Sequence, residues 1–107
     1  MEKPRVKVPK SVTRGEPFEV KALISHKMES GQRVDKKTGE KIPRKIINRF
    51  TCTLDGEEVF SANLHAAVSA NPYLAFYVRA EKSGELEFTW VDDDGSTAQT
   101  KKKFVVK

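Results

Sequence analysis

Cys52 is the first candidate for a reactive residue in this chain, because it is the only cysteine and a thiolate is a strong nucleophile. It lies in the stretch Phe50-Thr51-Cys52-Thr53-Leu54, where apolar and polar residues alternate as in a half-buried β-strand. The alternation places Cys52 on the same face as Phe50 and Leu54. We therefore expect it to pack in the core, away from the solvent and cations that make a thiol reactive. A pairing role with another chain is the alternative.

The two histidines and a run of aspartates are the other candidates for acid–base or metal chemistry. His26 and His65 stand at no metal-ligand spacing from each other or from Cys52, and we expect both at strand ends. The run DDDG at residues 92–95 superficially resembles a calcium loop. Consecutive aspartates, with no later glutamate at the required distance, do not fit that loop, so the run predicts a turn. We expect no metal, no cofactor and no enzymatic activity.

The elements that must position these residues are short strands. Seven segments alternate with period two and are separated by turn signals such as Asp55-Gly56 and Ser83-Gly84, and no window has a convincing helical period. The sequence therefore predicts an all-β fold, a seven-stranded antiparallel immunoglobulin-like β-sandwich. The Cys-Trp-Cys spacing of immunoglobulins is absent, so the likeness concerns architecture only. The predicted strands are residues 5–8, 18–24, 50–54, 58–62, 73–79, 85–91 and 98–106.

Length and composition indicate one globular domain over residues 1–107. A chain of this length buries roughly 65% of the surface that its unfolded form exposes, which is enough for one core without a disulfide bond or a structural metal. The net charge of +5 is a moderate bias, compatible with an acidic partner or with nucleic acid. The basic clusters, residues 33–45 and 101–103, contain no aromatic ring on which a base could stack. We therefore expect no nucleic-acid partner.

The chain also lacks the sequence features of a membrane protein. No segment approaches the ~20 apolar residues that span a bilayer, so no membrane association is expected. Residues 1–12 carry positive charge but no apolar stretch, and they do not form a signal-peptide pattern. Taken alone, that absence favours the cytosol.

A long connection between residues 26 and 43 interrupts the regular spacing of strands. Within it, residues 32–42 have the character of a small protruding hairpin around Gly39. Connections of this length are uncommon in compact domains and are often functional. A solvated ribbon without a function is the alternative, and the residues alone leave both open.

One predicted strand breaks the pattern of one wet face and one buried face. Leu74, Phe76 and Val78 can face the core, yet Tyr73, Ala75 and Tyr77 leave the other face apolar as well. Tyrosine is enriched at interfaces, and an exposed apolar surface usually marks a binding site. We expect a partner on this face. The alternative is that the segment 66–70 of the same chain covers it.

Four segments of the chain resemble the SoxZ family in matching order. They are LISHKMESGQR at 23–33, IPRKIINRFTC at 42–52, VFSANLHAAVSANPY at 59–73 and FTWVDDDGS at 88–96. The resemblance extends from about residue 4 to residue 106. It implies an immunoglobulin-like sandwich that serves as the non-catalytic subunit of the SoxYZ sulfur-carrier complex of thiosulfate oxidation.

The resemblance also implies a partner and a compartment. SoxZ subunits pair tightly with SoxY, whose C-terminal Gly-Gly-Cys-Gly-Gly arm carries the sulfur intermediates between enzymes. This sequence ends in KFVVK without a cysteine, so it matches the companion subunit rather than the carrier. The family implies a periplasmic location, reached by export together with a signal-bearing SoxY. The missing signal fits that route. The periplasmic expectation from the resemblance therefore replaces the cytosolic one.

Two surfaces follow as hypotheses for these contacts. We expect Tyr73, Ala75 and Tyr77 to face SoxY in a heterodimer. We expect the hairpin at residues 32–42, with Arg33 and the neighbouring Arg44, to make transient contact with enzymes of the pathway.

Overall fold

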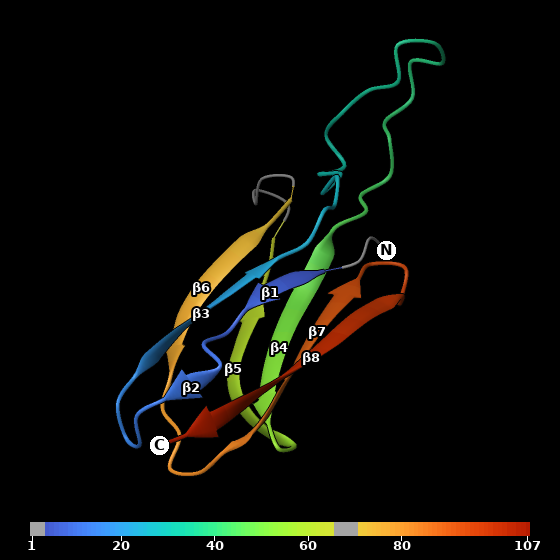
Figure 1. Cartoon of the computed structure of the whole chain (residues 1–107). Helices are drawn as coiled ribbons and strands as arrows, with labels where there is room; N and C mark the ends of the chain where they lie inside the picture. Colours follow the sequence, from blue (N-terminus) through green and yellow to red (C-terminus); the bar gives the residue numbers. More distant parts are fainter. Residues whose placement is uncertain (1–3, 66–70) are drawn as a thin grey trace.

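The computed structural model of the chain describes residues 4–65 and 71–107, and within them it contains strands and no helix (Figure 1). No helix in this part of the chain could therefore cross a membrane. The all-β prediction is confirmed. The strands are β1 (Arg5–Lys7), β2 (Ser11–Val12), β3 (Phe18–Leu23), β4 (Ile47–Leu54), β5 (Glu57–Asn63), β6 (Tyr73–Val78), β7 (Gly84–Asp92) and β8 (Thr97–Val106).

The strands form two sheets, ordered β1-β3-β6 and β2-β8-β7-β4-β5. Their number is eight in the described residues, not the seven that the sequence predicts, and β2 pairs with β8 in parallel. The amide of Val105 donates to the carbonyl of Lys10, and the amide of Lys107 donates to the carbonyl of Val12 (both 2.9 Å). A strand of two residues shows no alternation, so the sequence pattern could not reveal it.

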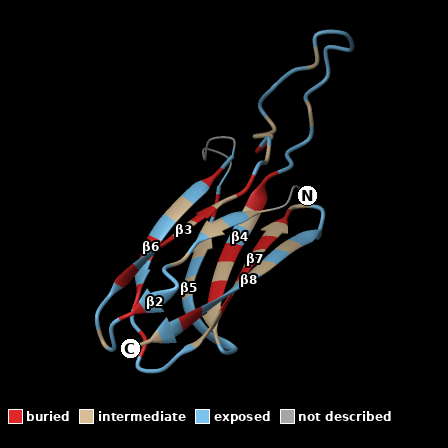
Figure 2. Cartoon of the chain, in the orientation of Figure 1, coloured by how far each residue is buried: buried red, intermediate tan, exposed pale blue. Residues whose placement is uncertain are grey.

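Buried residues line the strands of both sheets (Figure 2). The core that they form lies between the sheets and is centred on Phe50, whose side chain is fully buried. Its ring centroid lies 5.0 Å from that of Trp90 and 5.9–6.3 Å from those of Phe60, Phe76 and Phe88. The alternating residues predicted to point inward from β7, namely Leu86, Phe88 and Trp90, are buried as expected. Apolar burial at this density supplies the main stabilisation of such a domain.

The hairpin of β4 and β5 turns at Asp55 and Gly56, as predicted. Their φ angles are 49° and 89°, the left-handed values that a tight two-residue turn demands at both central positions. The pairing of β4 with β5 shifts register between Cys52 and Thr53. The hairpin thereby carries an irregularity at its turn end.

The predicted protruding hairpin is present as a ribbon that leaves the end of the sandwich (Figure 1). An isolated bridge joins Val34 to Lys41, and the amide of Asp35 donates to the carbonyl of Glu40 (2.8 Å). Gly39 turns the tip with a φ of 74°. We call residues 26–46 the ribbon, and we call the region where its two ends meet the sandwich, which includes His26 and Lys45, its root.

Replacing Phe50 with alanine should remove the centre of the aromatic core. We expect the free energy of unfolding to fall by about 3–5 kcal/mol, the range for deleting a buried aromatic ring. Urea denaturation followed by Trp90 fluorescence measures the change. Val59→Ala, at an exposed position of β5, serves as the control and should shift stability by under about 0.5 kcal/mol. Equal losses in both variants would contradict this account of the core.

Candidate partner-binding surfaces

The outer face of β6 is exposed, and its side chains are apolar or aromatic. Tyr73 is 55% exposed and Tyr77 is 69% exposed, with Ala75 exposed between them. The intervening Phe76 and Val78 are buried, so the strand alternates as expected and its outer face lies in solvent. The segment 66–70, which could have covered this face, lies outside the described residues. An interface role for the three outer residues stays a prediction.

The neighbouring strands continue this outer face with charged side chains of both signs. On β3, Glu19 lies opposite Tyr77 and forms an ion pair with Lys21 at 3.5 Å. Tyr73 pairs with Leu23 in register, and Ala75 pairs with Lys21. Beyond β3, Leu23 pairs with Arg5 of β1. An open hollow of about 220 Å³ lies between Tyr73 and these residues of β3 and β1. A protruding apolar side chain of a partner would fit such a hollow.

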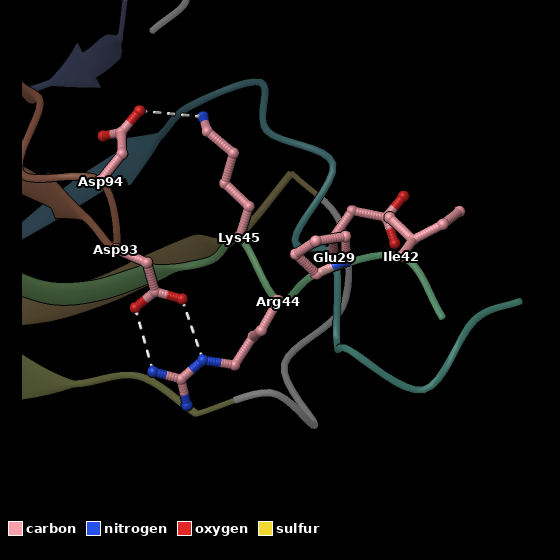
Figure 3. A pocket seen from close by; sticks show the side chains of 7 residues that line it. Glu29, Ile42, Arg44, Lys45, Asp93 and Asp94 are labelled. Carbon is pink, nitrogen blue, oxygen red and sulfur yellow. Dashed lines mark hydrogen bonds and ion pairs between the residues drawn. The ribbon is translucent and has the colours of Figure 1, made fainter. Parts of the chain in front are cut away.

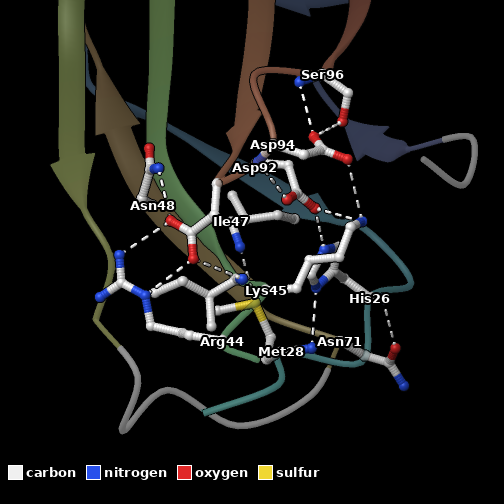
Figure 4. Close-up of polar contacts among 12 residues, drawn as sticks. His26, Met28, Arg44, Lys45, Ile47, Asn48, Asn71, Asp92, Asp94 and Ser96 are labelled. Carbon is white, nitrogen blue, oxygen red and sulfur yellow. Dashed lines mark hydrogen bonds and ion pairs between the residues drawn. The ribbon is translucent and has the colours of Figure 1, made fainter. Parts of the chain in front are cut away.

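The root of the ribbon is held by a buried carboxylate at a position where the sequence predicts only a turn. Asp92 ends β7 and is 1% exposed. Its Oδ2 accepts hydrogen bonds from His26 Nε2 at 2.5 Å and from Lys45 Nζ at 3.2 Å (Figure 4). The backbone amide of Asp94 donates to Oδ1 at 3.2 Å. Asp92 therefore ties both ends of the ribbon to β7.

These contacts set the pKa of Asp92. Burial alone raises the pKa of this carboxyl group, but the hydrogen bonds from His26, the Asp94 amide and Lys45 together outweigh it and lower the pKa. The same contact raises the pKa of Lys45, chiefly through its hydrogen bond to Asp92. The carboxylate is therefore ionised and fully hydrogen-bonded at neutral pH.

His26 has one tautomer in this arrangement. Its Nδ1 accepts a hydrogen bond from the amide of Met28 at 2.9 Å, so the proton is on Nε2, which donates to Asp92. Asn71 fixes the backbone beside it, because Asn71 Oδ1 accepts from the His26 amide and the Asn71 amide donates to the His26 carbonyl. His26 thus acts as a fixed structural donor.

Met28 is held in a left-handed backbone conformation with a φ of 54°, which is uncommon for a residue other than glycine. Its side chain is buried, and its sulfur accepts a hydrogen bond from the amide of Ile47 at 3.3 Å. Packing and this contact hold the strained residue in place. The turn at Met28 directs the first leg of the ribbon away from β3.

Asp93 binds the second leg of the ribbon. Its carboxylate accepts a bidentate pair of hydrogen bonds from Arg44, at 2.9 and 3.1 Å, and further bonds from Asn48 and the Ile46 amide (Figure 3, Figure 4). The hydrogen bond from Asn48 is the main cause that lowers the pKa of Asp93. Bidentate pairing fixes the direction of an arginine side chain. Arg44, predicted to contact enzymes, is thus oriented by its own chain while about half exposed.

Arg33 is also paired within the ribbon. It forms a hydrogen-bonded ion pair with Glu29, while its own side chain stays 64% exposed. The hydrogen bond from Arg33 lowers the pKa of Glu29. Arg33 and Arg44 are thus held by Glu29 and Asp93 at the ribbon and its root, whereas Tyr73 and Tyr77 lie on β6. An open hollow of about 420 Å³ lies beside Arg44 at the root (Figure 3).

The cysteine, the aspartate run and His65, which the sequence suggested as candidates for chemistry, occupy positions with a structural explanation. Cys52 is fully buried, as predicted, and burial raises its pKa to about 12. Asp92 to Gly95 form the predicted turn, with the Gly95 amide donating to the Asp92 carbonyl and a φ of 85° at Gly95. His65 is exposed just after β5. Within residues 4–65 and 71–107, no three His, Cys, Asp or Glu side chains are grouped to hold a metal ion.

Residues 6–103 match the family described as "Sulphur oxidation protein SoxZ". The chain belongs to the SoxZ family. The resemblance seen in the sequence is thereby confirmed, and the family supports a role in sulfur oxidation. A comparison with curated proteins finds no match.

Solved structures share the fold of this SoxZ-family chain at low sequence identity. The superoxide reductase (neelaredoxin) from Ignicoccus hospitalis superposes with a TM-score of 0.77 at 17% identity, over 99% of this chain and 81% of that protein. A superoxide reductase described as putative, from Thermotoga maritima, gives 0.75 at 15% identity, over 99% and 86%. The sulfur carrier protein SoxY from Chlorobium limicola gives 0.66 at 13%, over 97% and 78%. Identities this low establish the fold alone.

Stability should fall in acid because of the carboxylates at the root. The pKa of Asp94 is lowered from 3.8 to about 2, first by its hydrogen bonds from Ser96 and then by Lys45. A carboxyl group whose pKa is lower in the folded state stabilises the protein above its unfolded pKa, and the contribution is lost as pH falls through the folded value. We therefore expect stability to decline between about pH 4 and pH 2.

Urea denaturation of the wild type and of Asp94→Asn across that pH range measures this effect. The variant should show the shallower dependence on pH, because it lacks one of the titrating groups. Glu16→Gln, at an exposed loop position, is the matched control and should follow the wild type. Parallel curves for Asp94→Asn and the wild type would contradict the assigned role of Asp94.

Cys52 should be unreactive in the folded protein. Its burial and its raised pKa, about 12, keep the thiol protonated and away from reagents at pH 8. We expect a chromogenic disulfide reagent to modify less than about a tenth of the thiol in native buffer and all of it in urea. Rapid modification in native buffer would reopen a role for Cys52 in pairing or catalysis.

Proposed function

We propose that this chain is the non-catalytic subunit of a SoxYZ-type carrier complex that acts in thiosulfate oxidation. The match of residues 6–103 to the SoxZ family carries the proposal. In this role the chain binds a SoxY-type protein as a heterodimer and helps present that protein's sulfur-bearing cysteine arm to successive enzymes. The burial of Cys52 agrees with a division of labour in which the partner supplies the reactive thiol.

The outer face of β6 is the proposed contact with the SoxY-type subunit. Tyr73 and Tyr77 project from it into solvent, and both have few rotatable bonds for the area they can bury. Side chains of this type provide much of the binding energy at protein interfaces. The exposed Arg5 and Lys7 of the neighbouring β1 suit an acidic border on the partner.

The ribbon is the proposed recognition element for enzymes of the pathway. A tethered thiol reaches an active site because its tether keeps the local concentration high, and it needs a rigid body that each enzyme can recognise. The ribbon projects far from the sandwich, and its root is fixed to β7 by Asp92 and Asp93. Arg33 and Arg44 offer exposed positive charge along it. Transient contacts with acidic surfaces fit this arrangement.

The proposed compartment is the periplasm. In this proposal the chain folds with a signal-bearing SoxY-type subunit, and the two are exported together. The proposed interface on β6 is compatible with this route because it would form before export. Fractionation of cells that express the chain with and without that subunit tests the route.

Tyr77→Lys should weaken the complex with the cognate SoxY-family subunit. The substitution places a charge where an aromatic side chain is proposed to be desolvated, which costs about 2 kcal/mol, or about thirtyfold in Kd. Isothermal titration calorimetry measures the change. Val105→Lys is the matched control, because Val105 is 55% exposed on a strand of the other sheet.

The control should bind like the wild type, and both variants should unfold at wild-type urea concentrations. Unchanged affinity of Tyr77→Lys would remove β6 from the proposed interface. Failure of the wild-type chain to bind the SoxY-family subunit at all would overturn the proposed function itself.

A further inference from the structure

Three sheet edges of the described chain carry features that prevent pairing with another strand. Edge strands expose unpaired backbone groups, and proteins protect them with charge, shortness or irregularity. β1 has three residues and carries Arg5 and Lys7. β2 has two residues, and the part of β8 beyond it contains three consecutive lysines. β5 begins with two glutamates and pairs with β4 through a register shift.

β6 is the remaining edge, and it has none of these features. It pairs with β3 alone, in continuous register from Leu23 opposite Tyr73 to Phe18 opposite Val78. Its six residues, YLAFYV, include no charge and no proline. Figure 1 shows it at the left border of the molecule. A long, uncharged and regular edge is the type that accepts another strand.

The apolar side chains beside this edge are incompletely buried. Phe60 of β5 stacks on Phe76 across the sandwich with ring centroids 4.2 Å apart and planes 3° apart. Phe60 and Leu74 remain half-buried although both pack against the core. A strand added beside β6 would place its inward side chains next to them. Backbone pairing and core completion would therefore occur together.

We propose that the free edge of β6 pairs with an edge strand of the SoxY-type subunit and joins the two sandwiches through one continuous sheet. This inference rests on the proposed function, and it specifies how that interface is built. The SoxY from Chlorobium limicola shares this sandwich fold, so a SoxY-type subunit can offer a strand of matching twist. The net charge of +5 favours an acidic partner over a second copy of this chain.

The proposal also accounts for the outer face of β6. Tyr73 and Tyr77 would make cross-strand pairs with the partner strand, because neighbouring residues on one face of a sheet lie within side-chain reach. Tyrosines at such positions favour strand pairing. The exposed tyrosines and the uncharged edge are then two parts of one interface.

Amide hydrogen exchange of the full chain, alone and in complex with the cognate SoxY-family subunit, tests the proposal. In the free chain, alternate amides of β6 point away from β3 and should exchange quickly. In the complex these amides should slow at least about a hundredfold, while those of β1 stay unchanged. Fast exchange of the same amides in a saturated complex would overturn edge pairing.

Proline substitution at a fast-exchanging β6 position gives a second, independent measurement. Proline is tolerated at an edge where the amide faces solvent, so the variant should keep the fold. It removes a donor to the partner strand, and we expect Kd to rise about tenfold or more. Proline at an exposed position of β5, the edge with the register shift, is the control and should leave Kd unchanged.

The outcomes separate the two levels of the proposal. A wild-type chain that binds the SoxY-family subunit without protecting β6 keeps the proposed function and overturns the strand pairing. A wild-type chain that does not bind overturns both. Protection of β6 in the chain alone, with a dimeric mass in solution, would assign the edge to a second copy instead.

Discussion

Asp92 places a carboxylate inside the protein where β7 ends, and the direction of the ribbon depends on it. An ionised group at 1% exposure is tolerated only with several hydrogen-bond donors, and His26 and Lys45 supply two of them. Those donors stand at opposite ends of the ribbon. Separating either end from β7 would leave a buried charge without a partner, which is more costly than losing a surface ion pair. The ribbon therefore projects from the sandwich as a fixed element.

The same root shows how polar contacts and backbone strain support each other. Met28 adopts a left-handed conformation that would be unfavourable by itself, and its sulfur accepts the Ile47 amide. The Met28 amide in turn fixes the tautomer of His26 by donating to Nδ1. Asp93 binds the opposite leg through Arg44. The contacts of Met28 with Ile47 and of Arg44 with Asp93 join residues 19 and 49 positions apart in the sequence, so the ribbon is anchored by the sandwich and not only by its own short-range bonds.

The alternation of residues made the sandwich predictable, because one face of each strand is buried and the other is wet. The alternation of β7 also continues past the residues named in the prediction. Leu86, Phe88 and Trp90 point inward, and two residues later Asp92 does so too. The pattern thus indicated an inward carboxylate. Its partners could not be predicted in the same way, since His26 and Lys45 lie 66 and 47 residues away. The two-residue strand β2 gave no periodic signal at all.

A sandwich of this shape also occurs in superoxide reductases and in a SoxY, so the fold itself does not distinguish a subunit of a carrier complex. The distinguishing features lie at the surface. Among the described edges, charge, shortness or a register shift protects every one except β6. Proteins with such an exposed edge strand risk self-association. An unprotected edge in a domain whose other described edges are protected is therefore best explained by a partner that stays bound to it. The companion subunit of the proposed heterodimer would meet that condition.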